Sequence, residues 1–310
     1  GQKMSKSKGN VIDPLDIVDG ITLEALVRKR TTGLMQPHLA PGIEKATRKQ
    51  FPAGIEAHGT DALRYTFASL ATQSRDIRFE LGRVAGYRNF CNKLWNAARF
   101  VLMMTDGKPV APAGTVSASV IDRWILSRLR ESIVATDEAF AGYRFDMAAT
   151  ALYEFTWYEF CDWYLELAKP VLQGDDEAAA ATRRTLLTVL ETLLRALHPV
   201  MPFITEEIWQ RVVPVAGIAG DTIMTAAWPD AAQLPADAAA AADVDWMKGI
   251  ILAVRQIRGE MDISPARRLA PLAQGAKASD IDRFARYEAL LGRLAGIDPV
   301  RVLAGDEAAP

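Results

Sequence analysis

Tyr153-Glu154-Phe155-Thr156-Trp157-Tyr158-Glu159-Phe160-Cys161-Asp162-Trp163-Tyr164 is the stretch that decides the fold of this 310-residue chain. Its aromatic side chains would occur all round a helix, and a helix that is apolar on every side is buried by its neighbours. We therefore predict that a helix over residues 147–172 is the centre of a helical bundle. Glu159, Asp162 and Glu166 would share one side of it. Since no histidine or nucleophile is near, we interpret them as a solvated or salt-bridged face rather than an acid–base site.

Other predicted helices surround this one. A long helix over about 80–104 carries an apolar stripe on one side, made by Tyr87, Phe90, Cys91, Leu94, Ala97, Ala98 and Val101. Further helices are predicted from about 122 to 140, from 177 to 198, and from Pro202 onward. Because half of all residues are hydrophobic, the chain can bury a substantial core, and the predicted fold is mainly α.

The last part of the sequence has a different pattern. A helix over 244–261 is followed by two predicted strands, 267–272 and 299–303, with a helix over 279–294 between them. This order predicts a small α/β unit attached to the bundle.

Composition and charge limit the classes of function. Cys91 and Cys161 have no second Cys or His at ligand spacing, which argues against a metal site and against a disulfide framework and favours a reducing, cytoplasmic location. No apolar run approaches the length of a membrane span. Residues 1–99 carry 16 Lys and Arg against 9 Asp and Glu, so a polyanion would bind at this basic third.

A lysine-rich segment lies at the front of the chain. The segment is Lys3-Met4-Ser5-Lys6-Ser7, and it is followed by the turn signal Gly9-Asn10. Ammonium groups on long side chains act as point charges that suit the β- and γ-phosphates of ATP, and serines add hydrogen-bond donors. Lysines alone are more typical of a solvated basic segment.

The polar side of the long helix is a candidate RNA-binding face. It is formed by Asn89, Asn92, Lys93, Asn96 and Phe100. An aromatic ring between amides and an ammonium could stack on an unpaired base whose edges the polar groups read. Alternatively, another helix covers Phe100.

Arg78 and Arg83 precede or begin the long helix. They could contact RNA phosphates or bases, and they could equally bridge helices as structural residues.

Several of these segments resemble a known family. The string 3–7 is similar to the second signature of the class I aminoacyl-tRNA synthetases, and the similarity continues through Pro14. Within that class, the segments 34–37, 86–97 and 155–164 resemble the valyl-tRNA synthetases. By this resemblance Lys6 is the catalytic phosphate ligand and Lys3 assists it. Met4, Ser5 and Ser7 then complete the ATP-binding loop.

The resemblance also implies a division of the chain and a longer parent protein. Residues 1–79 would be the ATP loop and the stem-contact tail of the catalytic core, and 80–235 the anticodon-binding helical bundle. Residues 236–310 would lead to a missing coiled-coil arm. The HIGH-like signature of the class is absent and the chain does not begin with Met, so we interpret it as the C-terminal part of an enzyme.

The implied reaction joins valine to tRNA. ATP, with Mg²⁺, would activate valine as an adenylate, and the acyl group would pass to the 3′ end of a valine-accepting tRNA. The valine pocket would lie upstream, so the fragment alone is not expected to be catalytic, and we expect a monomer. Alternatives are an isoleucine- or leucine-tRNA ligase fragment and a stand-alone helical RNA-binding module. Many isoleucyl enzymes end in a cysteine-ligated zinc module. This chain has only Cys91 and Cys161, and neither belongs to such a module.

Overall fold

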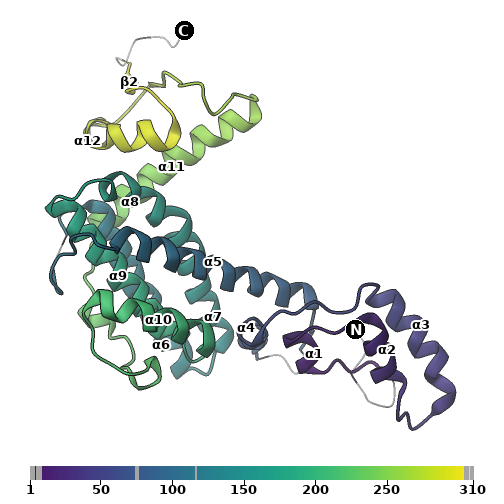
Figure 1. The fold of residues 1–310 in the computed structure, drawn as a ribbon. Helices are drawn as coiled ribbons and strands as arrows, with labels where there is room; N and C mark the ends of the chain where they lie inside the picture. Colours follow the sequence, from purple (N-terminus) through teal and green to yellow (C-terminus); the bar gives the residue numbers. More distant parts are fainter. Residues whose placement is uncertain (1–3, 5–8, 74–76, 116, 304–306, 308–310) are drawn as a thin grey trace.

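The structure is a computed structural model that describes residues 4, 9–73, 77–115, 117–303 and 307. Most of these residues are helical, which confirms the predicted mainly α fold (Figure 1). The α-helices are α1 (Pro14–Val18), α2 (Leu23–Thr31), α3 (Ala40–Gln50), α4 (Thr60–Leu70), α5 (Leu81–Thr105), α6 (Val120–Ala141), α7 (Phe145–Glu154), α8 (Leu165–Leu172), α9 (Glu177–Leu197), α10 (Pro202–Ala216), α11 (Ala238–Glu260) and α12 (Ala278–Ala295). The shorter elements are η2 (Pro37–Leu39), η3 (Phe155–Tyr164), η4 (Ile223–Thr225), η5 (Ala231–Gln233), β1 (Leu272–Ala273) and β2 (Arg301–Val302).

The aromatic stretch lies at the centre of the bundle, as predicted. It is continuous with α7 and α8, so one helical segment runs through residues 145–172, but its middle part, η3, is wound as a π-helix. Phe160 and Tyr164 are completely buried, and Trp157 stacks on Tyr153 with ring centroids 5.5 Å apart. The sequence pattern predicted the helix and its central position, but the segment is not buried on every side, because Tyr158 is exposed, and the pattern gave no sign of the wider turns.

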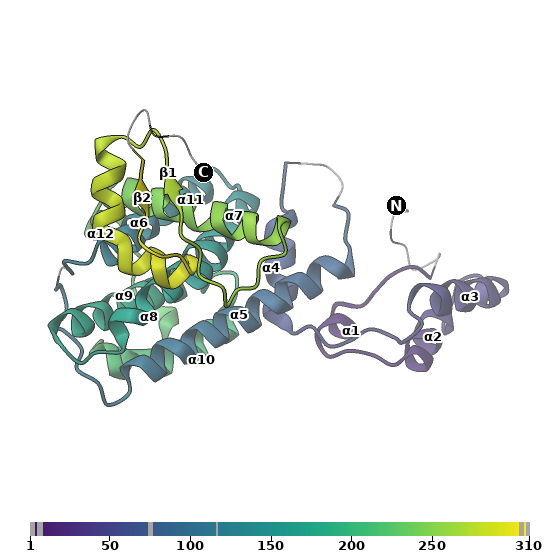
Figure 2. The same ribbon diagram turned by 90° about the horizontal axis from the view of Figure 1, so that it is seen from above.

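The long helix α5 joins the N-terminal unit, which contains α1 to α4, to the bundle (Figures 1 and 2). Its predicted apolar stripe is confirmed, because Phe90, Leu94 and Val101 have no exposed surface. Beside it, Asp61 of α4 accepts hydrogen bonds from the backbone N–H groups of Phe203 (3.3 Å) and Ile204 (2.7 Å) at the start of α10. A carboxylate at a helix N-terminus satisfies donors that have no intrahelical partner, so it fixes α4 against the bundle.

The C-terminal unit is a short β-α-β arrangement, as predicted, with strands of two residues each. β1 and β2 are parallel, with Leu272 paired to Arg301 and Ala273 to Val302, and α12 lies between them in sequence. The strands are shorter than predicted because the backbone at Leu269 forms only an isolated bridge to Ile297.

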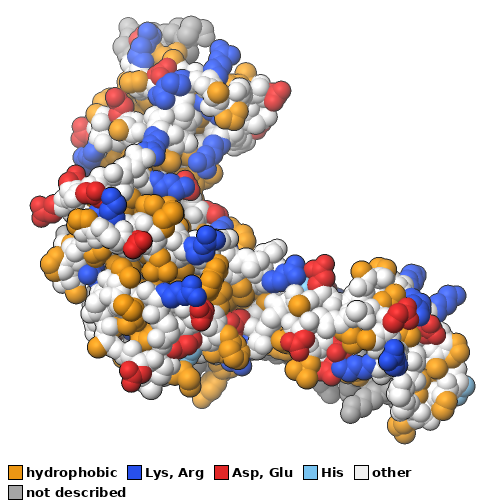
Figure 3. Space-filling view, viewed as in Figure 1, with side chains coloured by type: hydrophobic (Ala, Val, Ile, Leu, Met, Phe, Trp, Pro, Cys, Tyr) orange, Lys and Arg blue, Asp and Glu red, His pale blue; other side chains and the backbone are white. Residues whose placement is uncertain are grey.

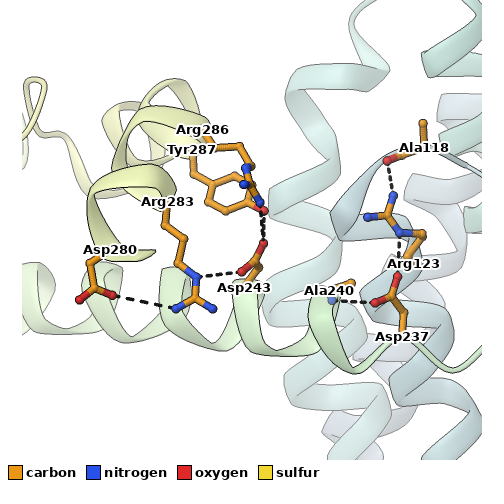
Figure 4. A network of polar contacts seen from close by, with 9 residues as sticks. All are labelled: Ala118, Arg123, Asp237, Ala240, Asp243, Asp280, Arg283, Arg286 and Tyr287. Carbon is orange, nitrogen blue, oxygen red and sulfur yellow. Dashed lines mark hydrogen bonds and ion pairs between the residues drawn. The ribbon is translucent and has the colours of Figure 1, made fainter. Parts of the chain in front are cut away.

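Helix α11 connects this unit to the bundle, and it packs against both α6 and α12. At its start Asp237 accepts a hydrogen bond from Arg123 of α6 (2.8 Å). Further along, Asp243 accepts hydrogen bonds from Arg283 (2.8 Å) and Tyr287 (2.5 Å) of α12 (Figure 4). The predicted boundary between 235 and 236 therefore lies just before α11, a helix that contacts both units. The division of the chain stays a prediction.

The molecule is bent, with the N-terminal and C-terminal units projecting from the bundle in different directions. Lys and Arg side chains recur along the inside of this bend (Figure 3). None of the helices in the described part of the chain has the length and apolar character needed to cross a membrane.

Candidate functional site

The predicted ATP loop is only partly described. Lys3, Ser5, Lys6 and Ser7 lie outside the described residues, and Met4 is exposed. The first residue described after the loop is Gly9, whose φ of +58° is in the left-handed region that glycine adopts without strain. The sequence predicted a sharp turn here for the same reason.

A cavity of about 420 Å³ adjoins Gly9. Its polar lining includes Asp13, Asp16, Lys29 and Arg30. The Lys29 ammonium donates hydrogen bonds to Asp13 (2.7 Å) and Asp16 (2.8 Å), which lowers the pKa of the Asp13 carboxyl and raises that of Lys29. The cavity thus contains an ion-paired lysine, while Arg30 has a different set of partners, described below.

The amide side of α5 is exposed as predicted. Asn89, Asn92 and Asn96 are all exposed, and they follow one another at i, i+3 and i+7 along the helix. A row of side-chain amides offers both donors and acceptors, which is the hydrogen-bonding capacity that recognition of unpaired bases requires.

Lys93 lies in the same row but is less available than predicted. Its ammonium forms an ion pair with Asp162 of η3 (2.5 Å) and lies 3.8 Å from the ring centroid of Trp157. The two residues come from a segment that is distant in sequence, so the spacing within α5 could not reveal them.

Phe100 is not isolated among polar groups, which corrects the position expected from the helical wheel. The ring is half-buried and packs against the core of the bundle, and the Lys169 ammonium of α8 lies 5.8 Å from its centroid. Neighbouring helices surround α5 on more than its apolar stripe, which is the alternative left open above. Contact of Phe100 with RNA stays a prediction.

Arg78 and Arg83 are both exposed. Neither forms an ion pair with any residue that the structure describes, so their cationic groups do not serve as bridges between helices within that part of the chain. Their contact with RNA also stays a prediction.

The carboxylates of the aromatic segment are salt-bridged, as predicted. Glu159 pairs with Lys248 (2.9 Å), Asp162 with Lys93, and Glu166 with its own neighbour Lys169.

The two cysteines are free, and burial raises the pKa of both thiols to about 12. Among the described residues, no group of three or more His, Cys, Asp or Glu could hold a metal ion.

Sequence reasoning missed two features near these sites. One is the cation–aromatic pairing of Lys93 with Trp157 and of Lys169 with Phe100; the only sequence signal was the aromatic density of η3, and it applied to the first pair alone. The other is the close approach of Ile43 in α3 to Gly9, which had no sequence signal.

Comparison with known proteins gives matches in both halves of the chain. Residues 1–80 match the family model "tRNA synthetases class I (I, L, M and V)", and residues 122–273 match "Anticodon-binding domain of tRNA ligase". The valine–tRNA ligases of Xylella fastidiosa strains 9a5c and M23 are each 54% identical to the chain over 328 aligned positions. These alignments cover 100% of the chain and 33% of each relative, so the chain spans about a third of their length.

One solved structure to which the chain is similar is that of the agnB2 leucyl-tRNA synthetase of Agrobacterium radiobacter K84, in a ternary complex with tRNA and LeuAMS. It is 15% identical, covers 98% of the chain and 31% of its own length, and gives a TM-score of 0.47.

Proposed function

Because this chain belongs to the class I tRNA synthetases and matches valine–tRNA ligases along its whole length, we propose that it is part of a valine–tRNA ligase. The identity to these ligases is the observation that carries the proposal, since it extends through the predicted ATP loop and the helical bundle alike. The full-length protein, here called the parent enzyme, would activate valine with ATP and transfer it to tRNA.

In this proposal the segment 3–7 acts on the phosphates of ATP. Lys6, assisted by Lys3, would hold the β- and γ-phosphates while negative charge develops on the departing pyrophosphate. A fixed ammonium stabilises that charge more in the transition state than in the ground state. Mg²⁺ would enter with ATP as its counter-ion. The valine pocket would be supplied by other parts of the parent enzyme, acting as a monomer in the cytoplasm.

The bundle would bind the anticodon loop of tRNA through the amide row of α5. Asn89, Asn92 and Asn96 would read unpaired bases, and Phe100 would offer a ring face for stacking. Arg78 and Arg83 would contact the backbone nearer the core. The basic side chains on the inside of the bend support this orientation, because they would attract the phosphate backbone of a large RNA (Figure 3).

The experiment that tests the reaction is valine-dependent exchange between ATP and pyrophosphate. The parent enzyme is expected to catalyse the exchange with valine and not with leucine, and the 310-residue chain alone is expected to show none. Exchange that depends on leucine or isoleucine instead would assign the chain to another member of the class. Exchange by the chain alone would overturn the assignment of the valine pocket to the rest of the protein.

RNA binding makes a separate prediction. We expect Asn92→Ala to raise the Kd for tRNA with a valine anticodon about tenfold, since loss of base contacts costs roughly 1–3 kcal/mol. Phe100→Leu, which keeps apolar volume but removes the ring, should have an effect of similar size because base stacking is lost. Kd is measured by filter binding at one fixed salt concentration.

The control variant is Gln256→Ala, which also shortens an exposed amide but on α11. It should leave Kd unchanged. Equal losses of affinity for tRNA with the valine anticodon and with a scrambled one would show that α5 does not read the anticodon.

A further inference from the structure

Gly9 is held from two sides by described residues. The Arg30 side chain of α2 donates a hydrogen bond from Nε to the carbonyl oxygen of Gly9 at 2.7 Å. On the other side, Ile43 of α3 is so close that a Cβ at position 9 would lie 2.6 Å from its Cδ1 atom. The contact with α3 therefore leaves no room for a side chain at position 9, and the positive φ of Gly9 independently favours glycine there.

The same arginine is attached to α3. Its Nη1 donates to Thr47 Oγ1 at 3.0 Å, and Thr47, which is completely buried, donates in turn to the carbonyl oxygen of Ile43 at 2.8 Å. The guanidinium also lies 5.6 Å from the ring centroid of Phe51, at the end of α3. Arg30 thus connects the backbone of Gly9 to a buried threonine in the middle of α3.

The partners of Arg30 distinguish it from the other cations near it. Lys29 pairs with two carboxylates, Asp13 and Asp16, and Arg48 pairs with Glu24 and Glu44. Arg30 forms no ion pair within the described residues, where its partners are a carbonyl, a hydroxyl and a ring. An arginine that donates to neutral groups contributes through the rigid geometry of its guanidinium rather than through charge pairing.

We propose that Arg30, supported by Thr47 and Ile43, is a positioning residue for the ATP loop, and that α3 acts on the reaction through it. This inference rests on the proposed function, because Gly9, which Arg30 holds, follows the segment 3–7 by two positions. Transition-state stabilisation by the loop depends on where its ammonium groups are placed, and a displacement of about 1 Å can cost about a hundredfold in rate. Arg30 does not contact ATP in this scheme; it fixes the backbone at Gly9, just after the loop.

The test uses Arg30→Lys and Thr47→Val. A lysine keeps the charge but cannot reach the Gly9 carbonyl and the Thr47 hydroxyl in the same geometry, and valine matches threonine in shape while removing the hydroxyl. In the parent enzyme, each variant is expected to lower kcat for valine-dependent exchange about tenfold, with KM for valine and Kd for tRNA unchanged. Arg48→Lys, which alters the exposed ion pairs of α3 with Glu24 of α2 and with Glu44 but leaves the contacts of Gly9 intact, should change kcat less than about twofold.

A second readout does not depend on catalysis. In the 310-residue chain, hydrogen–deuterium exchange of residues 9–13 should be faster in Arg30→Lys and Thr47→Val than in the wild type, while exchange in the bundle stays the same. Two results would overturn the inference. One is unchanged hydrogen–deuterium exchange of residues 9–13 in both variants. The other is a kcat of Arg30→Lys for valine-dependent ATP–pyrophosphate exchange within about twofold of an active wild type. If the wild-type parent shows no exchange with valine, the proposed function fails, and the hydrogen exchange result still decides whether Arg30 and α3 hold Gly9.

Discussion

Replacing Arg183 with methionine is expected to lower the free energy of unfolding of the bundle by about 3–5 kcal/mol, because the buried and partly buried acceptors of a completely buried guanidinium would lose their donor. Arg183 lies on α9 and has no exposed side-chain surface. Its guanidinium donates hydrogen bonds to the carbonyl oxygens of Met104 (3.0 Å), Pro109 (3.2 Å), Leu172 (3.4 Å) and Gly174 (2.5 Å) and to the Asp175 carboxylate (2.8 Å).

The positions of these acceptors explain the size of the effect. Met104 is in the last turn of α5 and Leu172 is the last residue of α8, and carbonyls at a helix C-terminus have no intrahelical donor. One arginine therefore serves the ends of two helices and the turn that leads into α9. Methionine fills a similar volume but offers no donors, so the Leu172 carbonyl would remain buried without this donor, and the partly buried carbonyls would have to bind water instead.

Urea unfolding followed by tryptophan fluorescence measures this difference, because all seven tryptophans lie between residues 95 and 246. The matched control is Arg211→Met on α10, where the arginine is 55% exposed and pairs with Glu207. That change should cost less than about 1 kcal/mol. A loss as small as this in Arg183→Met would show that the buried acceptors are satisfied in another way.

The sequence predicted much of the bundle, because its helices are specified by local patterns. The apolar stripe of α5 is a periodic feature and is buried as expected, and Phe155, Phe160 and Tyr164 of the aromatic η3 are buried too, although Tyr158 is exposed. Arg183 could not be recognised in this way. It follows the same sequence rules as the exposed arginines, and only the packing of the segments 104–109 and 172–175 around it makes it a core residue.

The candidate site shows the same limit. Exposure of Asn89, Asn92 and Asn96 follows from the phase of α5 alone and was predicted. The partners of Lys93 and Phe100 come from η3 and α8, so their position depended on how helices pack rather than on the helix that carries them. The contact of Arg30 with Gly9 likewise joins two segments 21 positions apart through a turn that no periodicity predicts.

Replacing Asp122 with alanine is the other change with a large expected effect, a loss of about 3 kcal/mol or more in the free energy of unfolding. The carboxylate is 1% exposed and accepts hydrogen bonds from Tyr164 (2.7 Å), Ser117 (2.6 Å) and Thr182 (2.7 Å). These donors come from η3, from the segment before α6 and from α9. Alanine would leave three buried hydroxyls without their acceptor, at about 1 kcal/mol or more for each.

Asp122→Asn is the matched control, since it keeps the volume and one acceptor oxygen while removing the titration. Burial raises the pKa of Asp122 above its ordinary value of 3.8, although the three hydroxyl donors act to lower it. The folded state then binds the proton more tightly than the unfolded state. Stability from this group is therefore complete below pH 3.8 and is lost as the pH rises through the folded-state pKa.

The free energy of unfolding of the wild type minus that of Asp122→Asn isolates this effect, because every other carboxylate is common to both proteins. We expect this difference to decrease as the pH rises from about 3.8 through the folded-state pKa of Asp122. A difference that stays constant over this range would mean that Asp122 is already ionised at its lower end. In that case the three hydrogen bonds, rather than burial, would control its charge, and the pKa would lie at or below the ordinary value.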